Sequence, residues 1–159
     1  MKHMHAYWRM EYVESPQKEK NSTNPFAEIP KLKNKEALIL FRSEFSYIVM
    51  NKFPYNAGHL LVVPFREVSD VSLLNEEELL DFWAMVMKAK KIVSEALSPD
   101  GFNIGMNIGQ CSGAGIPRHV HCHIVPRWSS DTNFMPVIDE TRVLHRAMDK
   151  MWLRLMEFV

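Results

Sequence analysis

The sequence predicts an α+β fold built around an antiparallel β-sheet. Its segments follow one another in the order strand, strand, strand, helix, strand, strand, helix. Consecutive strands joined by short turns are typical of antiparallel pairing, whereas a parallel doubly wound sheet alternates strands with helices. The chain has 159 residues, of which 47% are hydrophobic. This is enough for a single domain with a buried core, five antiparallel strands and two main helices.

Three strands are expected in the first half of the chain, over residues 36–42, 45–51 and about 59–64. The first two, EALILFR and FSYIVMN, are rich in β-branched, aromatic and other apolar residues. Only Ser43 and Glu44 separate them, which predicts a hairpin. The third strand follows a turn that is rich in Pro, Asn and Gly.

The first main helix is expected to begin after Asn75. Asn75 and Glu78 have the spacing of a capping box, in which each side chain accepts a hydrogen bond from the other residue's backbone amide. Apolar residues then recur at helical spacing until residues 98–101, SPDG, end the helix. The apolar face expected in the core consists of Leu79, Trp83, Val86, Met87, Val93 and Leu97.

The second half of the chain continues the pattern. Residues 101–109, GFNIGMNIG, alternate apolar side chains with Asn and Gly, as expected of a strand with one small, polar face. A last amphipathic helix is expected from about residue 141. In terms of domains, residues 1–35 are expected to form an N-terminal arm and loop that packs on one domain of residues 36–159.

The charge balance argues against a large polyanionic partner. Lys and Arg number 19, as do Asp and Glu, so the formal net charge is zero. Binding to nucleic acid or to an acidic membrane surface usually depends on a basic excess. A small anionic ligand held by a few groups is compatible with this balance. The sequence shows neither a secretory signal nor a run of about 18 apolar residues, so we expect a cytoplasmic protein.

Residues 116–128, IPRHVHCHIVPRW, place three of the seven histidines at alternating positions. In an extended strand, side chains two residues apart point to the same face. His119, His121 and His123 are therefore expected to line one side of a strand. The residues between them would face the core, where Cys122 is expected as a buried free thiol.

Three imidazoles on one face allow three interpretations. They could be structural histidines, although such a cluster needs partners if buried and repels itself if charged. They could bind zinc, although no acidic residue that could orient the rings lies between Asp100 and Asp131. Alternatively, a neutral imidazole could attack phosphorus while a neighbour assists the leaving oxygen. Gly109, Gly113 and Gly115 favour this last interpretation, because they let backbone amides approach a phosphate closely.

The histidine run resembles the signature of the histidine triad (HIT) superfamily. Upstream, NKFPYNAGHLLVVPFREV is similar to a second family block, whose Pro-Tyr-Asn-x-Gly-His turn supplies a fourth active-site histidine, here His59. GFNIGMNIGQCSGAGIPRHVHCHIVPRWSSDTNF is similar to the branch that contains bacterial diadenosine tetraphosphate phosphorylases. The resemblance covers most of the chain. It implies a HIT-like fold and a homodimer in which the two sheets join into one.

The resemblance also implies roles for individual residues. His121 would be the nucleophile that attacks the α-phosphorus, and His123 would hold a phosphate oxygen or protonate the leaving group. His119 and His59 would orient the nucleophile. The implied substrate-binding residues are Asn107, Gly113, Ala114 and Gly115 for the phosphates, Trp128 for the shape of the pocket, and Phe26, Ile29 and Asn51 for the nucleoside. As a large aromatic residue, Trp128 could equally serve in packing alone.

The chain departs from the family pattern where many relatives bind a structural zinc ion. In those relatives a Cys-x-x-Cys pair and a later histidine supply ligands, but this chain has Asn24, Ala27 and Glu67 there. We therefore expect no metal and no other cofactor. The turn over residues 113–116 is Gly-Ala-Gly-Ile instead of the Gly-Gln of hydrolase branches, which favours the phosphorylase-like branch.

The expected activity is cleavage of dinucleoside polyphosphates, such as diadenosine tetraphosphate, through a covalent nucleotidyl-histidine. The acceptor could be phosphate or water. Two alternatives stay open, a nucleoside phosphoramidase-type HIT hydrolase and a nucleotide-binding regulator with little turnover. The expected partners are the nucleotide and a second copy of the chain, and neither nucleic acid nor a membrane is expected.

Overall fold

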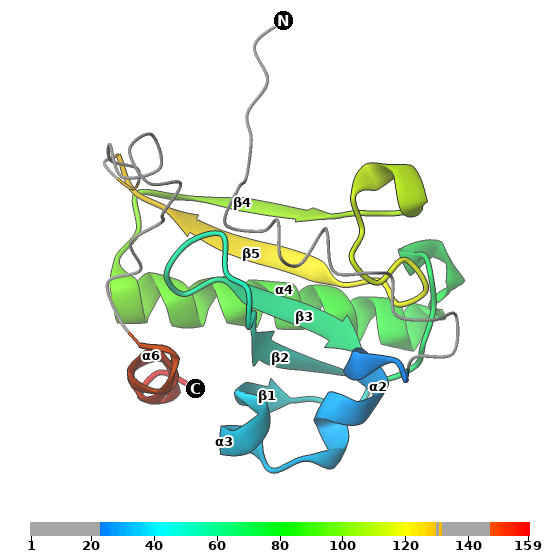
Figure 1. The fold of residues 1–159 in the computed structure, drawn as a ribbon, viewed down its shortest axis with the longest axis horizontal. Coiled ribbons are helices and arrows are strands. Elements are labelled where there is room, and N and C mark those ends of the chain that lie inside the picture. Colours follow the sequence, from blue (N-terminus) through cyan, green and yellow to red (C-terminus); the bar gives the residue numbers. More distant parts are fainter. Residues whose placement is uncertain (1–22, 130, 132–146) are drawn as a thin grey trace, which may run out of the picture.

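A five-stranded antiparallel sheet forms the centre of the molecule (Figure 1), as the sequence predicts. The computed structural model describes residues 23–129, 131 and 147–159. The strands run in the order β1-β2-β3-β5-β4, which leaves β1 and β4 at the two edges. They are β1 (Ile39–Arg42), β2 (Ser46–Met50), β3 (Leu60–Pro64), β4 (Gly101–Met106) and β5 (Cys122–Arg127).

In the part of the chain that the structure describes, two main helices pack on one face of the sheet, as predicted. They are α4 (Glu76–Leu97) and α6 (Met148–Met156), whose apolar side chains share a core cluster with the sheet. Three short turns of helix precede β1 near the other face: α2 (Pro25–Glu28), η2 (Ile29–Lys31) and α3 (Asn34–Ala37). Two further 3₁₀ turns are η3 (Val71–Leu73) and η4 (Gln110–Ser112).

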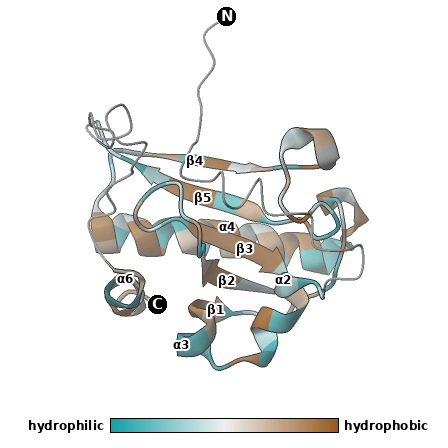
Figure 2. Ribbon diagram, viewed as in Figure 1, coloured by the Kyte–Doolittle hydropathy of each residue, from teal (hydrophilic) through white to brown (hydrophobic). Residues whose placement is uncertain are grey.

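Strand alternation divides the core into two clusters. Leu60 and Ile124 pair across β3 and β5 and point toward α4, in the larger cluster. Leu61 and Val63 point to the opposite face, where Phe26 of α2 joins them. The central strands are hydrophobic on both faces because both are covered (Figure 2). The second face is the one on which the histidines lie.

The predicted capping box starts α4. The Asn75 side-chain oxygen accepts from the Glu78 amide at 2.9 Å, and the Glu78 carboxylate accepts from the Asn75 amide at 2.9 Å. The helix ends at Leu97, and Ser98 adopts a left-handed conformation with φ 47°. Both ends of this helix are therefore set by local sequence signals.

The predicted core face of α4 is wrong at two positions. Trp83 is 42% exposed and Met87 is 52% exposed, whereas Phe82 and Met85 are buried. Apolar side chains occur around much of this helix, so that helical spacing alone allows two choices of face. The sheet selects the face centred on Phe82 and Ala89.

Several element boundaries differ from the sequence prediction. β1 begins at Ile39 because Glu36 and Ala37 belong to α3, and Leu38 turns the chain with φ 57°. β4 ends at Met106 and does not continue to residue 109. The last helix begins at Met148, and the residues from 141 to 146 expected in it lie outside the described part of the chain.

The arm predicted over residues 1–35 is described only from residue 23 onward, and its N-terminal part lies outside the described residues. Phe26, in the described part, packs into the second core cluster. No helix in the described ranges is long and apolar enough to cross a membrane.

Candidate active site

Four histidines meet on the face of the sheet opposite α4. His59 immediately precedes β3, and His123 lies in β5 opposite Leu61. His119 and His121 come just before β5, which begins only at Cys122. The strand is therefore shorter than predicted. The intervening residues are buried in the main core as expected, and burial raises the pKa of the Cys122 thiol to about 11.

His121 is held in the protonation state of a nucleophile. Its Nδ1 lies 2.9 Å from the backbone carbonyl oxygen of His119. A carbonyl can only accept, so Nδ1 carries the proton and donates it, and Nε2 keeps its lone pair. Burial lowers the pKa of His121 below its ordinary value of 6.5. A neutral imidazole with a fixed tautomer is thus present at neutral pH.

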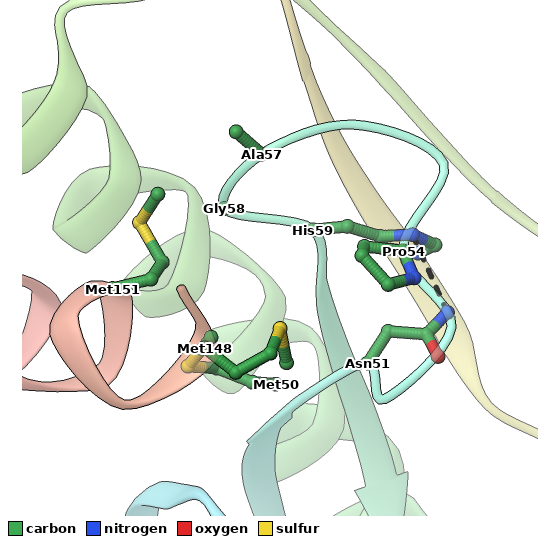
Figure 3. A pocket seen from close by; sticks show the side chains of 8 residues that line it. All are labelled: Met50, Asn51, Pro54, Ala57, Gly58, His59, Met148 and Met151. Atoms are coloured by element: carbon green, nitrogen blue, oxygen red, sulfur yellow. Dashed lines mark hydrogen bonds between the residues drawn. The ribbon is translucent and has the colours of Figure 1, made fainter. Parts of the chain in front are cut away.

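His59 and His123 form a second pair with a fixed direction. The Tyr55 backbone amide donates to Nδ1 of His59 at 3.0 Å, and the Asn51 side-chain nitrogen lies 3.3 Å from the same atom (Figure 3). His59 therefore carries its proton on Nε2 and donates it to Nδ1 of His123 at 2.9 Å. This leaves the proton of His123 on Nε2, and the His121 and His123 ring centroids are 4.9 Å apart.

Tyr55 also stacks on His59, with ring centroids 4.9 Å apart and an interplanar angle of 19°. The sequence interpretation did not assign it a role, although it lies within the Pro-Tyr-Asn-x-Gly-His block. Asn51, expected near the ribose, instead contacts His59, and its oxygen accepts from the Phe53 amide at 2.9 Å. A ribose contact for Asn51 stays a prediction.

His119 is fully buried and bonded through both ring nitrogens. Nε2 lies 2.8 Å from the carbonyl oxygen of Pro64, and Nδ1 lies 2.8 Å from Nδ2 of Asn24. Burial lowers its pKa. Because both of its ring nitrogens already have hydrogen-bond partners, His119 has no nitrogen available to coordinate a metal ion together with His121 and His123.

Phe26 covers His121. Its ring centroid lies 4.8 Å from that of His121 and 5.6 Å from that of His119, and its side chain is buried. Ile29 packs in the same apolar cluster. Of the two residues predicted to hold the nucleoside, Phe26 contacts His119 and His121 directly, and Ile29 packs in the cluster that Phe26 belongs to.

The predicted phosphate-binding turn follows β4. The last pair of β4 and β5 is Met106 with Cys122, so Asn107 directly follows and His121 directly precedes a paired residue. Gly109 and Gly113 have φ values of 83° and 82°, which side chains other than glycine rarely adopt. Gly113 and Gly115 are exposed, and Ala114 is half-buried. A phosphate contact by this turn stays a prediction.

Trp128 is half-buried just after β5. Its backbone amide donates to Asp131 at 3.3 Å, and the same carboxylate accepts from the side chain of Asn56 at 2.9 Å. These bonds fix the backbone that carries Trp128. A pocket role and a packing role for its indole both stay open.

The positions of the family zinc site are joined by hydrogen bonds. Asn24 donates to the Glu67 carboxylate at 2.7 Å, and Arg118 lies 3.3 Å from the same carboxylate. Within the described ranges, no group of three or more His, Cys, Asp and Glu side chains could hold a metal ion.

A small hollow lies between α6 and the turn before β3 (Figure 3). Met50, Met148 and Met151 form one side of it, and the His59 ring points away from them. Adaptable methionine side chains at this place are typical of core packing. We therefore locate the chemistry on the opposite side of His59, beside His123.

Comparison with known proteins identifies similar sequences. The HIT domain family model matches residues 32–130. An AP-4-A phosphorylase of Mycobacterium tuberculosis is 40% identical over 147 residues, which are 89% of this chain and 75% of that protein. A bis(5'-adenosyl)-triphosphatase of Dictyostelium discoideum is 34% identical over 97 residues, 61% of this chain and 64% of that protein.

Solved structures share the fold. A hypothetical histidine triad nucleotide-binding protein of Sulfolobus tokodaii superposes with a TM-score of 0.68 at 21% identity, covering 84% of this chain and 90% of that one. A zinc-bound histidine triad family protein of Mycobacterium smegmatis gives a TM-score of 0.61 at 21% identity, over 76% and 81% of the two chains.

Proposed function

Because this chain belongs to the HIT domain family, we propose that it cleaves dinucleoside polyphosphates, with diadenosine tetraphosphate as a substrate. The relatives named as AP-4-A phosphorylase and as bis(5'-adenosyl)-triphosphatase support this substrate class. The observation that carries the mechanism is the bond from Nδ1 of His121 to the His119 carbonyl, since it directs the lone pair of Nε2 outward as a nucleophile.

In the first step, Nε2 of His121 attacks the α-phosphorus. A nitrogen–phosphorus bond forms, and the bond from phosphorus to the bridging oxygen breaks and releases the other nucleotide. Nε2–H of His123 donates a hydrogen bond to the leaving oxygen and stabilises its developing charge. His59 keeps His123 in the required tautomer through the 2.9 Å contact.

In the second step, an acceptor attacks phosphorus and breaks the bond to His121, which restores the neutral imidazole. We assign inorganic phosphate as the acceptor, because the 40% identical relative is named as a phosphorylase. Diadenosine tetraphosphate would then yield ATP in the first step and ADP in the second. With water as the acceptor, the second product would be AMP.

Substrate contacts are part of the same proposal. We assign the phosphates to Asn107 and to the amides of the turn at residues 113–115; this is supported by the last pair of β4 and β5, Met106 with Cys122, which brings Asn107 and His121 next to the end of the sheet. Phe26 and Ile29 form an apolar wall for the nucleoside, and Trp128 shapes the far side of the pocket. No cofactor takes part in this scheme, and the cytoplasm is the proposed location.

A homodimer is part of this proposal. β4 is an edge strand, and Ile104 on it is 38% exposed. Leu80, Trp83 and Met87 form an exposed apolar stripe on α4. Lys90, one turn further on, lies over the Phe102 ring of β4, so this stripe is on the side of α4 that leans toward the free edge. Pairing of two β4 strands would cover both features.

The test is to incubate the protein with diadenosine tetraphosphate, with and without inorganic phosphate, and to separate the products by chromatography. Repeated turnover to ATP and ADP is expected only with phosphate, and without phosphate no more than one ATP per active site should be released. AMP and ATP in both conditions would show that water is the acceptor. The His121→Asn variant is the control, and it should bind nucleotide without turnover. No turnover by the unaltered protein would contradict the proposed substrate class.

A further inference from the structure

Asn24 occupies the centre of a hydrogen-bond network that the sequence interpretation treated only as a missing zinc ligand. Its side chain is buried, and its oxygen accepts from the Phe26 amide at 3.0 Å, which caps α2. Its nitrogen donates to Glu67 at 2.7 Å and contacts Nδ1 of His119 at 2.8 Å. One amide therefore joins the helical turn before the sheet, the loop after β3 and the histidine run.

These contacts assign the hydrogens. The Asn24 oxygen is committed to an amide donor, so its NH₂ group must face Glu67 and His119, with one hydrogen for each. Nδ1 of His119 must then accept. Pro64 offers only a carbonyl to the other side of the ring, so Nε2 must donate. Asn24 and Pro64 therefore both require the neutral His119 tautomer that carries its proton on Nε2. A second proton, on Nδ1, would point at the NH₂ group of Asn24.

The Asn24 amide also lies between Glu67 and His119, which would attract each other if His119 were charged. Burial and the positive charge of Arg118 disfavour a charged His119, whereas the hydrogen bond to the Pro64 carbonyl and the negative charge of Glu67 favour it. His121 is the other titratable group that senses His119. A neutral amide between Glu67 and His119 satisfies both with hydrogen bonds, and no proton has to be taken up.

We propose that Asn24 is a positioning residue of the active site, whose amide holds His119 in its neutral Nε2–H form and thereby fixes the carbonyl that orients His121. Its catalytic consequence rests on the proposed function, because it acts through the nucleophile assigned there. The same side chain holds Phe26 against His121 by capping α2. The ring that covers the nucleophile and the backbone that aims it are thus held by one amide.

The Asn24→Asp variant tests the proposal, because Asp keeps the oxygen that caps α2 and removes the two donated hydrogens. Nitrogen-15 NMR of the His119 ring is the first measurement. In the unaltered protein at neutral pH we expect one protonated and one unprotonated ring nitrogen. In the variant we expect both to be protonated, since Nδ1 now faces carboxylates. We expect kcat to fall about tenfold and KM to change less than about twofold.

Two controls separate positioning from stability. Asn75→Asp makes the same change at the helix cap of α4 and should leave the His119 spectrum and kcat unaltered. Glu67→Gln added to Asn24→Asp removes the repulsion between the two carboxylates. It should restore thermal stability without restoring kcat.

Three outcomes would overturn the proposal: a proton on Nδ1 of His119 in the unaltered protein, an unaltered His119 tautomer in Asn24→Asp, or full recovery of kcat in the double variant. The NMR result does not depend on turnover. A protein that shows the expected tautomer but does not cleave diadenosine tetraphosphate would refute the proposed function and leave the hydrogen assignment standing.

Discussion

The burial of His121 predicts how its reactivity depends on pH, and Phe26→Ala is the perturbation that tests it. The Phe26 ring lies 4.8 Å from the imidazole of His121, which is only 6% exposed. This burial lowers the pKa of His121 below 6.5. Neutral His121 therefore predominates at and above pH 6.5, and under the proposed mechanism the reaction is lost only as the pH falls below that value.

The magnitude follows from the titration of an unshielded histidine. With a pKa of 6.5, such a side chain is half neutral at pH 6.5 and about a quarter neutral at about pH 6.0. The rate of the unaltered protein, relative to its constant rate at higher pH, should therefore exceed one half at pH 6.5 and about a quarter at about pH 6.0. Phe26→Ala admits water to the imidazole and should move the midpoint up toward 6.5. Loss of the ring also costs up to about 3–5 kcal/mol in stability.

The assay should follow the first step alone, in a single turnover without inorganic phosphate, because phosphate itself titrates near neutral pH. Circular dichroism at each pH verifies that the chain stays folded. Phe65→Ala is the matched control, since Phe65 belongs to the same apolar cluster but packs on Tyr47. An unaltered protein with its midpoint at or above pH 6.5, or a Phe26→Ala midpoint that does not move, would refute the reasoning.

Two further predictions concern the turn before β3. His59→Phe keeps an aromatic ring for Tyr55 to stack on but removes the donor to His123, and kcat should fall by up to about tenfold in steady-state assays. An unaltered kcat would contradict the assigned hydrogen-bond direction. Gly58→Ala would place a Cβ 2.4 Å from a methyl carbon of Leu97 at a φ of 77°, and should cost about 1–3 kcal/mol in denaturant unfolding. Gly101→Ala meets no atom within 4 Å and is the control, and equal unfolding midpoints for the two variants would refute the steric argument.

Local rules predict the parts of this fold that depend on neighbouring residues. The capping box of Asn75 and Glu78 and the alternation of the histidine run are of this kind, because each involves residues two to three positions apart. Trp83 and Met87 were assigned wrongly because the buried face of α4 is chosen by the sheet beneath it, which helical spacing does not include. The predicted start of β1 is wrong for a similar reason. Leu38 adopts a left-handed conformation that ends α3, so that β1 begins only at the next residue.

In the candidate site, too, the sequence predicts some features and not others. The motif predicts which side chains form the site, but their protonation states depend on backbone groups and on one amide that the motif does not include. The proton of His119 is placed by Pro64 and Asn24, which are 55 and 95 residues away, and that of His59 by the backbone of Tyr55. Backbone carbonyls and amides have no sequence signature, so no motif could have revealed them.

Fixed tautomers explain why a cluster of four imidazoles can be buried together. Charged rings at centroid distances of about 5 Å would repel one another strongly in a medium of low dielectric constant. Three of the rings meet a partner that can only donate or only accept: His121 meets the His119 carbonyl, His119 meets the Pro64 carbonyl and the Asn24 NH₂ group, and His59 meets the Tyr55 amide. His123 takes its tautomer from His59. The neutral state is therefore imposed from outside the triad. The Nε2 lone pair of His121 and the Nε2–H of His123 are complementary because backbone groups and one buried amide fix the protons of His121, His119 and His59, and His59 in turn fixes the proton of His123.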